Sequence, residues 1–205
     1  MKDILSYTDK EILEQVHKLR VAYKLKNTIR FGASRNSEEH AESVAEHVFA
    51  LIYLAHYFLE HELSAKNLNR EKVYDILLFH DFGEIKHGDI PYHLKTDKDR
   101  HKEDAAAVEV FASLPEPLNI TGKTLWEEYE TKITPEARFA NAIDKIEPGF
   151  EVLDPIYKRT FEKNKFTYDM HIGKKLVATE GFPVMRRFVE VIANEMEARG
   201  IFWKA

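Results

Sequence analysis

A histidine and an aspartate interrupt an apolar helical stripe near the middle of the sequence. The stripe consists of Val73, Ile76 and Leu77, which recur at helical spacing. His80 occupies the next position on it, and Asp81 follows directly. An ionised aspartate at the end of a buried helix is costly unless it is paired or bound to a metal. Since an inward histidine is more often a hydrogen-bonded core residue than a ligand, the pair alone leaves both interpretations open.

Two other segments with helical spacing each place a metal-type ligand on an inner face. His47 lies on an apolar stripe, three residues after Val44. Asp144 continues a stripe with Ala137 and Ala140, whose small side chains leave room for a bulky group. Imidazole nitrogens combined with carboxylate oxygens suit Mn, Co, Ni, Zn or Fe better than Mg. The joint occurrence of three such positions therefore favours a site for one divalent transition metal cation, with a buried polar core as the alternative.

The composition limits the chemistry and the class of protein. The 205-residue chain has no cysteine, so disulfides, zinc–thiolate sites and cysteine nucleophiles are excluded. Its net charge of -5 argues against a nucleic-acid-binding protein. The N-terminal segment mixes charged and apolar residues unlike a signal peptide, and no run approaches the roughly 18 apolar residues of a membrane span. We therefore expect a cytoplasmic protein with neither a membrane nor a nucleic-acid partner.

The elements that must position these side chains are all expected to be helices. Apolar residues recur at helical spacing along almost the whole chain, and strand-like alternation is nearly absent. The pattern predicts an all-α, single-domain helical bundle over residues 1–205. Helices are expected at about 9–26, 41–62, 70–80, 98–114, 122–130, 135–150, 154–162, 168–179 and 183–199. Gly83 and the segment 88–91, Gly-Asp-Ile-Pro, break the pattern and indicate a functional loop.

The candidate ligands also resemble a known signature. His47, the pair His80-Asp81 and the distant Asp144 resemble the H…HD…D pattern of the HD-domain metal-dependent phosphohydrolases, which are all-helical. Residues 42–47, Glu-Ser-Val-Ala-Glu-His, are similar to a segment of the 5′-deoxynucleotidase branch of that family. Segments 80–91, 30–36 and 126–130 are similar to further motifs of the branch or of its eukaryotic relatives, and the correspondence runs from about residue 12 to residue 150.

The resemblance implies a metal site with a base beside it. The implied ligands of one divalent cation are His47, His80, Asp81 and Asp144. Glu84 is implied to act as a general base or to orient water, because it lies close to the site if the helix continues one turn beyond Asp81. Asp89 is implied to lie near the sugar and the leaving oxygen.

The resemblance also implies substrate contacts. Arg30 matches a phosphate clamp, since a guanidinium can hold two phosphate oxygens. Phe31 stands where the bacterial enzymes have tryptophan, so the choice between deoxyribose and ribose stays open. Glu128 is a weaker candidate for support behind the metal ligands, with Glu127 and Glu130 as rivals.

The predicted function is hydrolysis of nucleoside 5′-monophosphates, with 2′-deoxyribonucleotides as the expected substrates. The alternatives are an HD hydrolase of nucleoside di- or triphosphates or of phosphodiesters, and a non-catalytic nucleotide sensor. Lys86, Lys95 and Lys98, near the predicted loop, keep the polyphosphate alternative open. The resembled nucleotidases form dimers, so a homodimer is expected by analogy.

Overall fold

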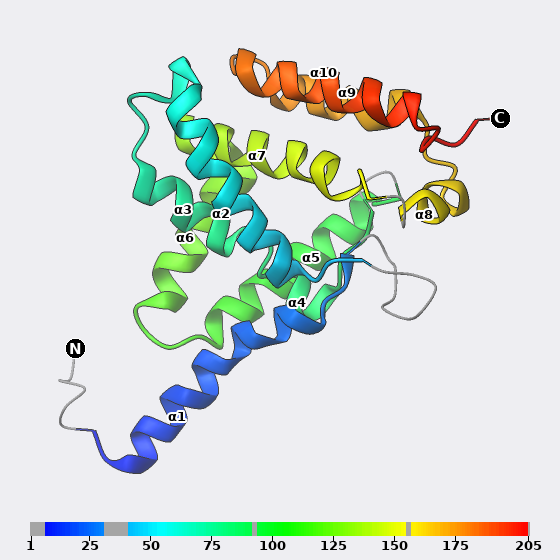
Figure 1. The fold of residues 1–205 in the computed structure, drawn as a ribbon. Coiled ribbons are helices and arrows are strands. Elements are labelled where there is room, and N and C mark those ends of the chain that lie inside the picture. Colours follow the sequence, from blue (N-terminus) through cyan, green and yellow to red (C-terminus); the bar gives the residue numbers. More distant parts are fainter. Residues whose placement is uncertain (1–6, 31–40, 92–93, 155–156, 205) are drawn as a thin grey trace.

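The computed structural model describes residues 7–30, 41–91, 94–154 and 157–204, and its regular elements are helices (Figure 1). The N-terminal part comprises α1 (Asp9–Leu19), the 3-10 helix η2 (Arg20–Asn27), α2 (Val44–His61), the 3-10 helix η4 (Leu63–Ala65) and α3 (Arg70–Phe79). The middle comprises α4 (Glu84–His87), α5 (Asp97–Ala112), α6 (Leu118–Thr131) and α7 (Pro135–Glu151). The C-terminal part comprises α8 (Lys158–Lys163), α9 (Tyr168–Ala178) and α10 (Pro183–Ala198). The predicted all-α class is confirmed.

Helix α7 is the central element around which the others pack. It contacts α2, α3, α6, α9 and α10. Its buried side chains include Phe139, Ile143 and Ile146, which join the largest apolar cluster of the core. Thr134 caps its first turn by accepting a hydrogen bond from the backbone of Ala137, and Pro135 begins the helix. A side chain on α7 therefore has a well-fixed position in the molecule.

The N-terminal helical region differs from the single helix expected at 9–26. The α-helix ends at Leu19, and the chain continues as the 3-10 helix η2. In Figure 1, α1 extends away from the other helices, and it contains no buried residue. Its apolar residues Ile12, Leu13 and Val16 are exposed. The amphipathic pattern thus predicted the helix correctly, but the helix buries none of its apolar side chains in the core.

The chain leaves its helical path at the His80-Asp81 pair. Helix α3 ends at Phe79, a turn follows, and the short α4 begins at Glu84. Gly88 ends α4 with a φ of 76°, a left-handed value that favours glycine. The expected interruption after residue 83 thus coincides with this turn and with the end of α4. None of the described helices is long and apolar enough to cross a membrane.

Candidate metal centre and substrate pocket

His47 is placed by the start of α2. Ser43 accepts a hydrogen bond from the backbone N–H of Glu46, and the Glu46 carboxylate accepts one from the backbone N–H of Ser43 at 2.7 Å. This reciprocal capping box fixes the first turn of the helix, and His47 follows immediately. The Glu-Ser-Val-Ala-Glu-His segment therefore combines a helix cap with an inward imidazole that is 0% exposed.

A short antiparallel bridge brings Arg30 to the same place. The backbone N–H of Arg30 donates to the carbonyl of Glu42 at 3.0 Å, and that of Val44 donates to the carbonyl of Thr28 at 2.9 Å. These bonds pair Ile29 with Ser43. They align the segment before residue 31 with the start of α2, so the Arg30 and Glu42 side chains meet.

His80 and Asp81 project from the end of α3. The Nδ1 atom of His80 lies 2.9 Å from the carbonyl oxygen of Leu77, to which it donates. In the neutral imidazole, that hydrogen bond leaves the lone pair of Nε2 directed toward the cluster, as in histidines that bind metals. Asp81 lies in the turn after the helix, and its Oδ2 is 3.1 Å from His80 Nε2.

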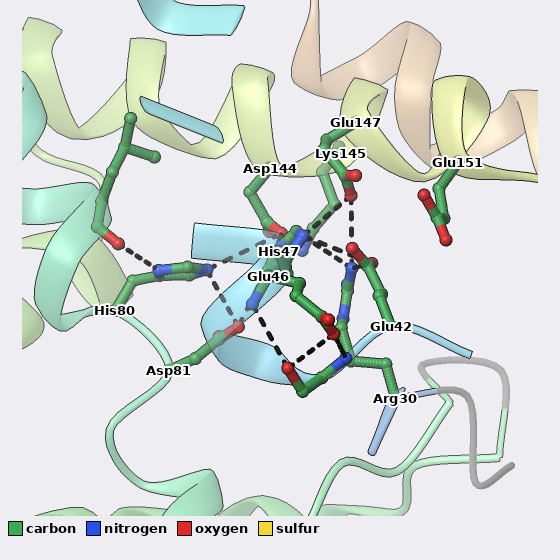
Figure 2. A network of polar contacts seen from close by, with 12 residues as sticks. Arg30, Glu42, Glu46, His47, His80, Asp81, Asp144, Lys145, Glu147 and Glu151 are labelled. Atoms are coloured by element: carbon green, nitrogen blue, oxygen red, sulfur yellow. Dashed lines mark hydrogen bonds and ion pairs between the residues drawn. The ribbon is translucent and has the colours of Figure 1, made fainter. Parts of the chain in front are cut away.

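Asp144 approaches from α7 and completes the group (Figure 2). Its Oδ1 lies 3.2 Å from His47 Nε2 and 3.8 Å from His80 Nε2. Its Oδ2 accepts a hydrogen bond from the hydroxyl of Tyr129 at 2.6 Å and contacts the ammonium of Lys145. The two histidines and Asp81 each offer an atom within 4.8 Å of the others. The structure thus brings together all four side chains expected to bind a metal.

The donor set fits a divalent cation. His80 Nε2 is buried and has no hydrogen-bond partner of suitable geometry among the described residues, although Asp81 and Asp144 lie close. The imidazole nitrogen thus lies between two carboxylates without a well-aligned hydrogen bond, and a cation held by two imidazoles and two carboxylates would satisfy all of these atoms. Nitrogen and oxygen donors of this kind suit transition metals better than Mg.

The electrostatics also favour positive charge between the four side chains. Burial lowers the pKa of His80, but the carboxylates of Asp81 and Asp144 outweigh burial and raise it to about 10. Burial raises the pKa of Asp81, but the neighbouring His80 outweighs it and lowers the pKa to about 2. The carboxylates therefore attract a positive charge to this position, whether it is a proton or a metal ion.

A second group of polar side chains supports His47 from behind. His47 Nδ1 lies 2.8 Å from Glu147 Oε2, and Arg30 Nη1 lies 3.2 Å from the same oxygen. Arg30 also forms a buried ion pair with Glu42. Arg30 Nη1 and His47 Nδ1 are only 2.6 Å apart, and we interpret Glu147 as the acceptor that both share. With Nδ1 donating to Glu147, His47 keeps Nε2 for the centre of the cluster.

Glu84 lies in the same pocket, at the start of α4. It is buried, and its Oε2 has no hydrogen-bond partner among the described residues. Burial and the nearby charges of Asp81 and Asp89 raise its pKa well above the usual value. Asp89 lines the pocket as well. The helix does not continue from Asp81 as expected, yet the turn and α4 still bring Glu84 to the pocket.

The pocket has a cationic side formed by lysines. Lys95, Lys145, Lys174 and Lys175 line it. Lys95 is paired with Glu103, and Lys175 Nζ donates to the backbone carbonyl of Lys145 at 2.5 Å. Burial lowers the pKa of Lys175 to about 7. Lys175 is therefore only partly charged at neutral pH, and the positive charge along this side comes mainly from Lys95, Lys145 and Lys174.

One expected site residue lies away from the cluster, and another lies outside the described residues. Glu128 does not contact the cluster: it forms an ion pair with Lys72 at 2.7 Å and accepts a hydrogen bond from Thr134. The neighbouring Tyr129 is the residue that reaches Asp144. Phe31, expected near the sugar, lies outside the described residues, as do Arg35 and Asn36 of the same motif.

Several polar residues of the site were not identified from the sequence. Glu147 lies three residues after Asp144, so it shares the inner face of the helix, and that spacing was a usable signal. Lys145 follows Asp144 directly. Tyr129 lies within the resembled segment 126–130, in which Glu128 was chosen instead, whereas Lys175 approaches from α9 and no local pattern marks it as a neighbour of the cluster.

Comparison with known proteins shows the family of the chain. The model of the family described as HD domain matches residues 22–182. A 5′-deoxynucleotidase of Schizosaccharomyces pombe is 28% identical over 186 residues, covering 88% of this chain and 87% of the relative. A 5′-deoxynucleotidase of Xenopus laevis is 30% identical over 138 residues, covering 66% of each chain. The chain thus matches just under two thirds of the length of this vertebrate relative.

Solved structures share the arrangement of helices. A predicted metal-dependent phosphohydrolase from Magnetospirillum magnetotacticum is 25% identical with a TM-score of 0.78, covering 96% of this chain and 100% of the other. An HD-domain phosphohydrolase from Listeria innocua is 19% identical with a TM-score of 0.63, covering 91% of this chain and 92% of the other, which shows a common fold. The chain therefore belongs to the HD domain family, and the resemblance to its metal-dependent phosphohydrolases is confirmed.

Proposed function

We propose that the protein hydrolyses nucleoside 5′-monophosphates, with 2′-deoxyribonucleotides among its substrates, and releases nucleoside and phosphate. The observation that carries the proposal is the buried Nε2 of His80, which faces His47, Asp81 and Asp144 without a hydrogen-bond partner among the described residues. The names of the relatives from Schizosaccharomyces pombe and Xenopus laevis support the choice of substrate.

The four inward side chains are proposed to hold one divalent cation of Mn, Co, Ni, Fe or Zn. These ligands are His47, His80, Asp81 and Asp144. When bound, the cation would lower the pKa of a coordinated water and offset charge developing on the phosphoryl group. Tyr129 and Glu147 hold Asp144 and His47 in orientation through the hydrogen bonds described above.

Glu84 is proposed to move the proton. Burial and the charges of Asp81 and Asp89 raise the pKa of its carboxyl group, which makes the carboxylate a stronger base than an exposed one. In this role it accepts a proton from the attacking water. Asp89, on the same pocket wall, is proposed to contact the sugar or the leaving oxygen.

Arg30 and Lys145 are proposed to orient the phosphate. Both line the pocket beside the cluster. Arg30 is held in place by Glu42 and Glu147, so its guanidinium does not need to be ordered when the substrate binds. The ammonium of Lys145 lies against Asp144 and adds a second positive charge.

A second candidate is hydrolysis of nucleoside di- or triphosphates. It is favoured by the lysines on one side of the pocket, Lys95, Lys145 and Lys174, which add cationic side chains to that of Arg30, with Lys95 paired to Glu103 and Lys145 to Asp144. Both candidates use the same metal ligands, so substrate preference distinguishes them.

The test is phosphate release from a panel of nucleotides by protein stripped with a chelator and reloaded with Mn, Co or Mg. The panel contains deoxy- and ribonucleoside 5′-monophosphates, 3′-monophosphates, and di- and triphosphates. We expect metal-dependent release from 5′-monophosphates that is lost in Asp81→Ala. Release from di- or triphosphates alone would replace the first candidate with the second. Tight metal binding without release from any nucleotide would contradict hydrolysis.

A further inference from the structure

The pocket extends well beyond the candidate metal ligands. Asp144, Lys145, Pro148 and Val152 all line it. These positions follow one face of α7, and Val152 immediately follows its last residue. Eight residues of helix span about 12 Å, at 1.5 Å per residue. A substrate with its phosphate at Asp144 would therefore reach the C-terminal end of α7.

The far end of the pocket is aromatic and comes from the C-terminal part of the chain. Its wall consists of Tyr157, which precedes α8, Phe161 on α8, Phe166 after α8, and His171 on α9; together we call them the aromatic end. The rings of Phe161 and Phe166 pack edge to face with centroids 5.0 Å apart. Thr160 and Asn164 add polar groups to the same wall. Apolar walls with a few polar groups are typical of sites for organic ligands.

His171 is buried, and one of its ring nitrogens has no hydrogen-bond partner among the described residues. The residue is 3% exposed and lines the pocket, and its Nε2 has no hydrogen-bond partner among the described residues. Burial and the nearby Lys175 lower its pKa to about 2, so the imidazole is neutral at neutral pH. A neutral imidazole nitrogen can donate or accept one hydrogen bond, depending on the tautomer.

The backbone of α7 approaches His171 closely at Gly149. A Cβ atom added to Gly149 of α7 would lie 3.9 Å from His171 Nε2 and 3.3 Å from a methyl group of Ile192. The glycine thus lets α9 and α10 pack close to α7, near the far end of the pocket. An unpartnered buried nitrogen is unfavourable, and a hydrogen bond with a bound ligand would offset that cost.

We propose that the aromatic end holds the base of the nucleotide, with His171 Nε2 hydrogen-bonded to a ring nitrogen or carbonyl oxygen of that base. This inference rests on the proposed function, because it assumes that the phosphate lies at the cluster on α7. The sugar then lies between them, beside Pro148, and the base packs against Phe161 and Phe166. The C-terminal helices thus select the substrate, whereas residues 30–147 carry out the reaction.

The first test is binding of thymidine and deoxyadenosine, which lack phosphate, to the metal-free protein. We expect His171→Leu to weaken nucleoside binding about tenfold, the effect of losing roughly one buried hydrogen bond. His171→Gln places an amide near the position of Nε2 and is expected to restore most of the affinity. Equal nucleoside binding by the wild-type protein and His171→Leu would overturn the proposal.

A second measurement separates base recognition from hydrolysis. With metal restored, kcat/KM for deoxynucleoside 5′-monophosphates should fall about tenfold in His171→Leu, whereas that for deoxyribose 5-phosphate, which has no base, should not change. An equal fall for both substrates would contradict the base contact. If the wild-type protein hydrolyses none of them, the proposed function fails, while the nucleoside-binding result still decides the role of His171.

The wild-type protein provides a test that does not depend on folding of a variant. The imidazole nitrogen resonances of His171 should shift when thymidine or deoxyadenosine is added, because hydrogen bonding changes the shielding of Nε2. Unchanged resonances at saturating nucleoside would overturn the proposal.

Discussion

Glu84 combines burial with two neighbouring negative charges, and its role can be tested by a single substitution. Glu84→Gln keeps the size of the side chain but cannot take up a proton. We expect kcat to fall about 10²- to 10³-fold, the usual contribution of a general base, while bound metal, measured by elemental analysis, is unchanged.

The control for Glu84 is Glu130→Gln, because Glu130 lines the same pocket and burial also raises its pKa. We expect its kcat to stay within a few-fold of that of the wild-type protein. Equal losses of kcat in the two variants would mean that Glu84 acts only through the general charge of the pocket.

His171 also predicts how stability depends on pH. Its pKa is about 2 in the folded protein and 6.5 in the unfolded chain. Above pH 6.5 both states carry a neutral imidazole, so the group has no effect. Below pH 6.5 the unfolded chain binds a proton that the folded protein does not, and the free energy of unfolding falls.

His171→Gln should remove this dependence on pH. The comparison is the free energy of unfolding of the variant minus that of the wild-type protein. This difference should be about 2 kcal/mol larger at pH 5 than at pH 8. Urea unfolding at the two pH values measures the difference. An identical pH dependence in both proteins would show that folding does not lower the pKa of His171.

At the scale of elements, the start of α2 links helix stability to the metal site. Ser43→Ala removes the side-chain half of the capping box just before His47. We expect the free energy of unfolding to fall by about 1 kcal/mol and metal affinity to weaken, because the first helical turn is less well fixed. Denaturant unfolding and competition with a chelator measure the two effects.

Thr8 provides a matched control, because it forms the same type of capping box with Glu11 at the start of α1. Thr8→Ala removes an equivalent hydrogen bond from a helix that supplies none of the proposed metal ligands. It should leave metal affinity unchanged. If both substitutions weaken metal binding equally, the local position of His47 is not the cause.

Some of the helices and site residues could be predicted from the sequence, and others could not. His47 and Asp144 were found because helical spacing predicts which face of α2 and α7 points inward. The extent of α3 was predicted to within one residue, whereas the last stretch of the predicted first helix is a 3-10 helix. Tyr129 and His171 were missed because their place in the site depends on how α6 and α9 pack, which local spacing does not encode.

At the scale of the whole molecule, α1 stands apart from the other helices. Because it buries no residue, a chain beginning at Arg20 should have the same free energy of unfolding within about 0.5 kcal/mol. Its hydrolysis of nucleotides should also be unchanged. Denaturant unfolding and phosphate release at several protein concentrations measure both.

Measuring stability at several protein concentrations also tests whether α1 contributes to a dimer. If the full chain becomes more stable at higher concentration and the shortened chain does not, then α1 packs against a second copy, as the expected homodimer allows. A large loss of stability that is independent of concentration would contradict the separation of α1 from the core.

The pairing of Ile29 with Ser43 has a consequence for how such enzymes can diverge. Its two backbone hydrogen bonds hold Arg30 beside Glu42 through main-chain atoms alone. The side chain at position 29 can therefore change in evolution without displacing the guanidinium, because the register of the backbone, and not the identity of that side chain, sets the place of Arg30.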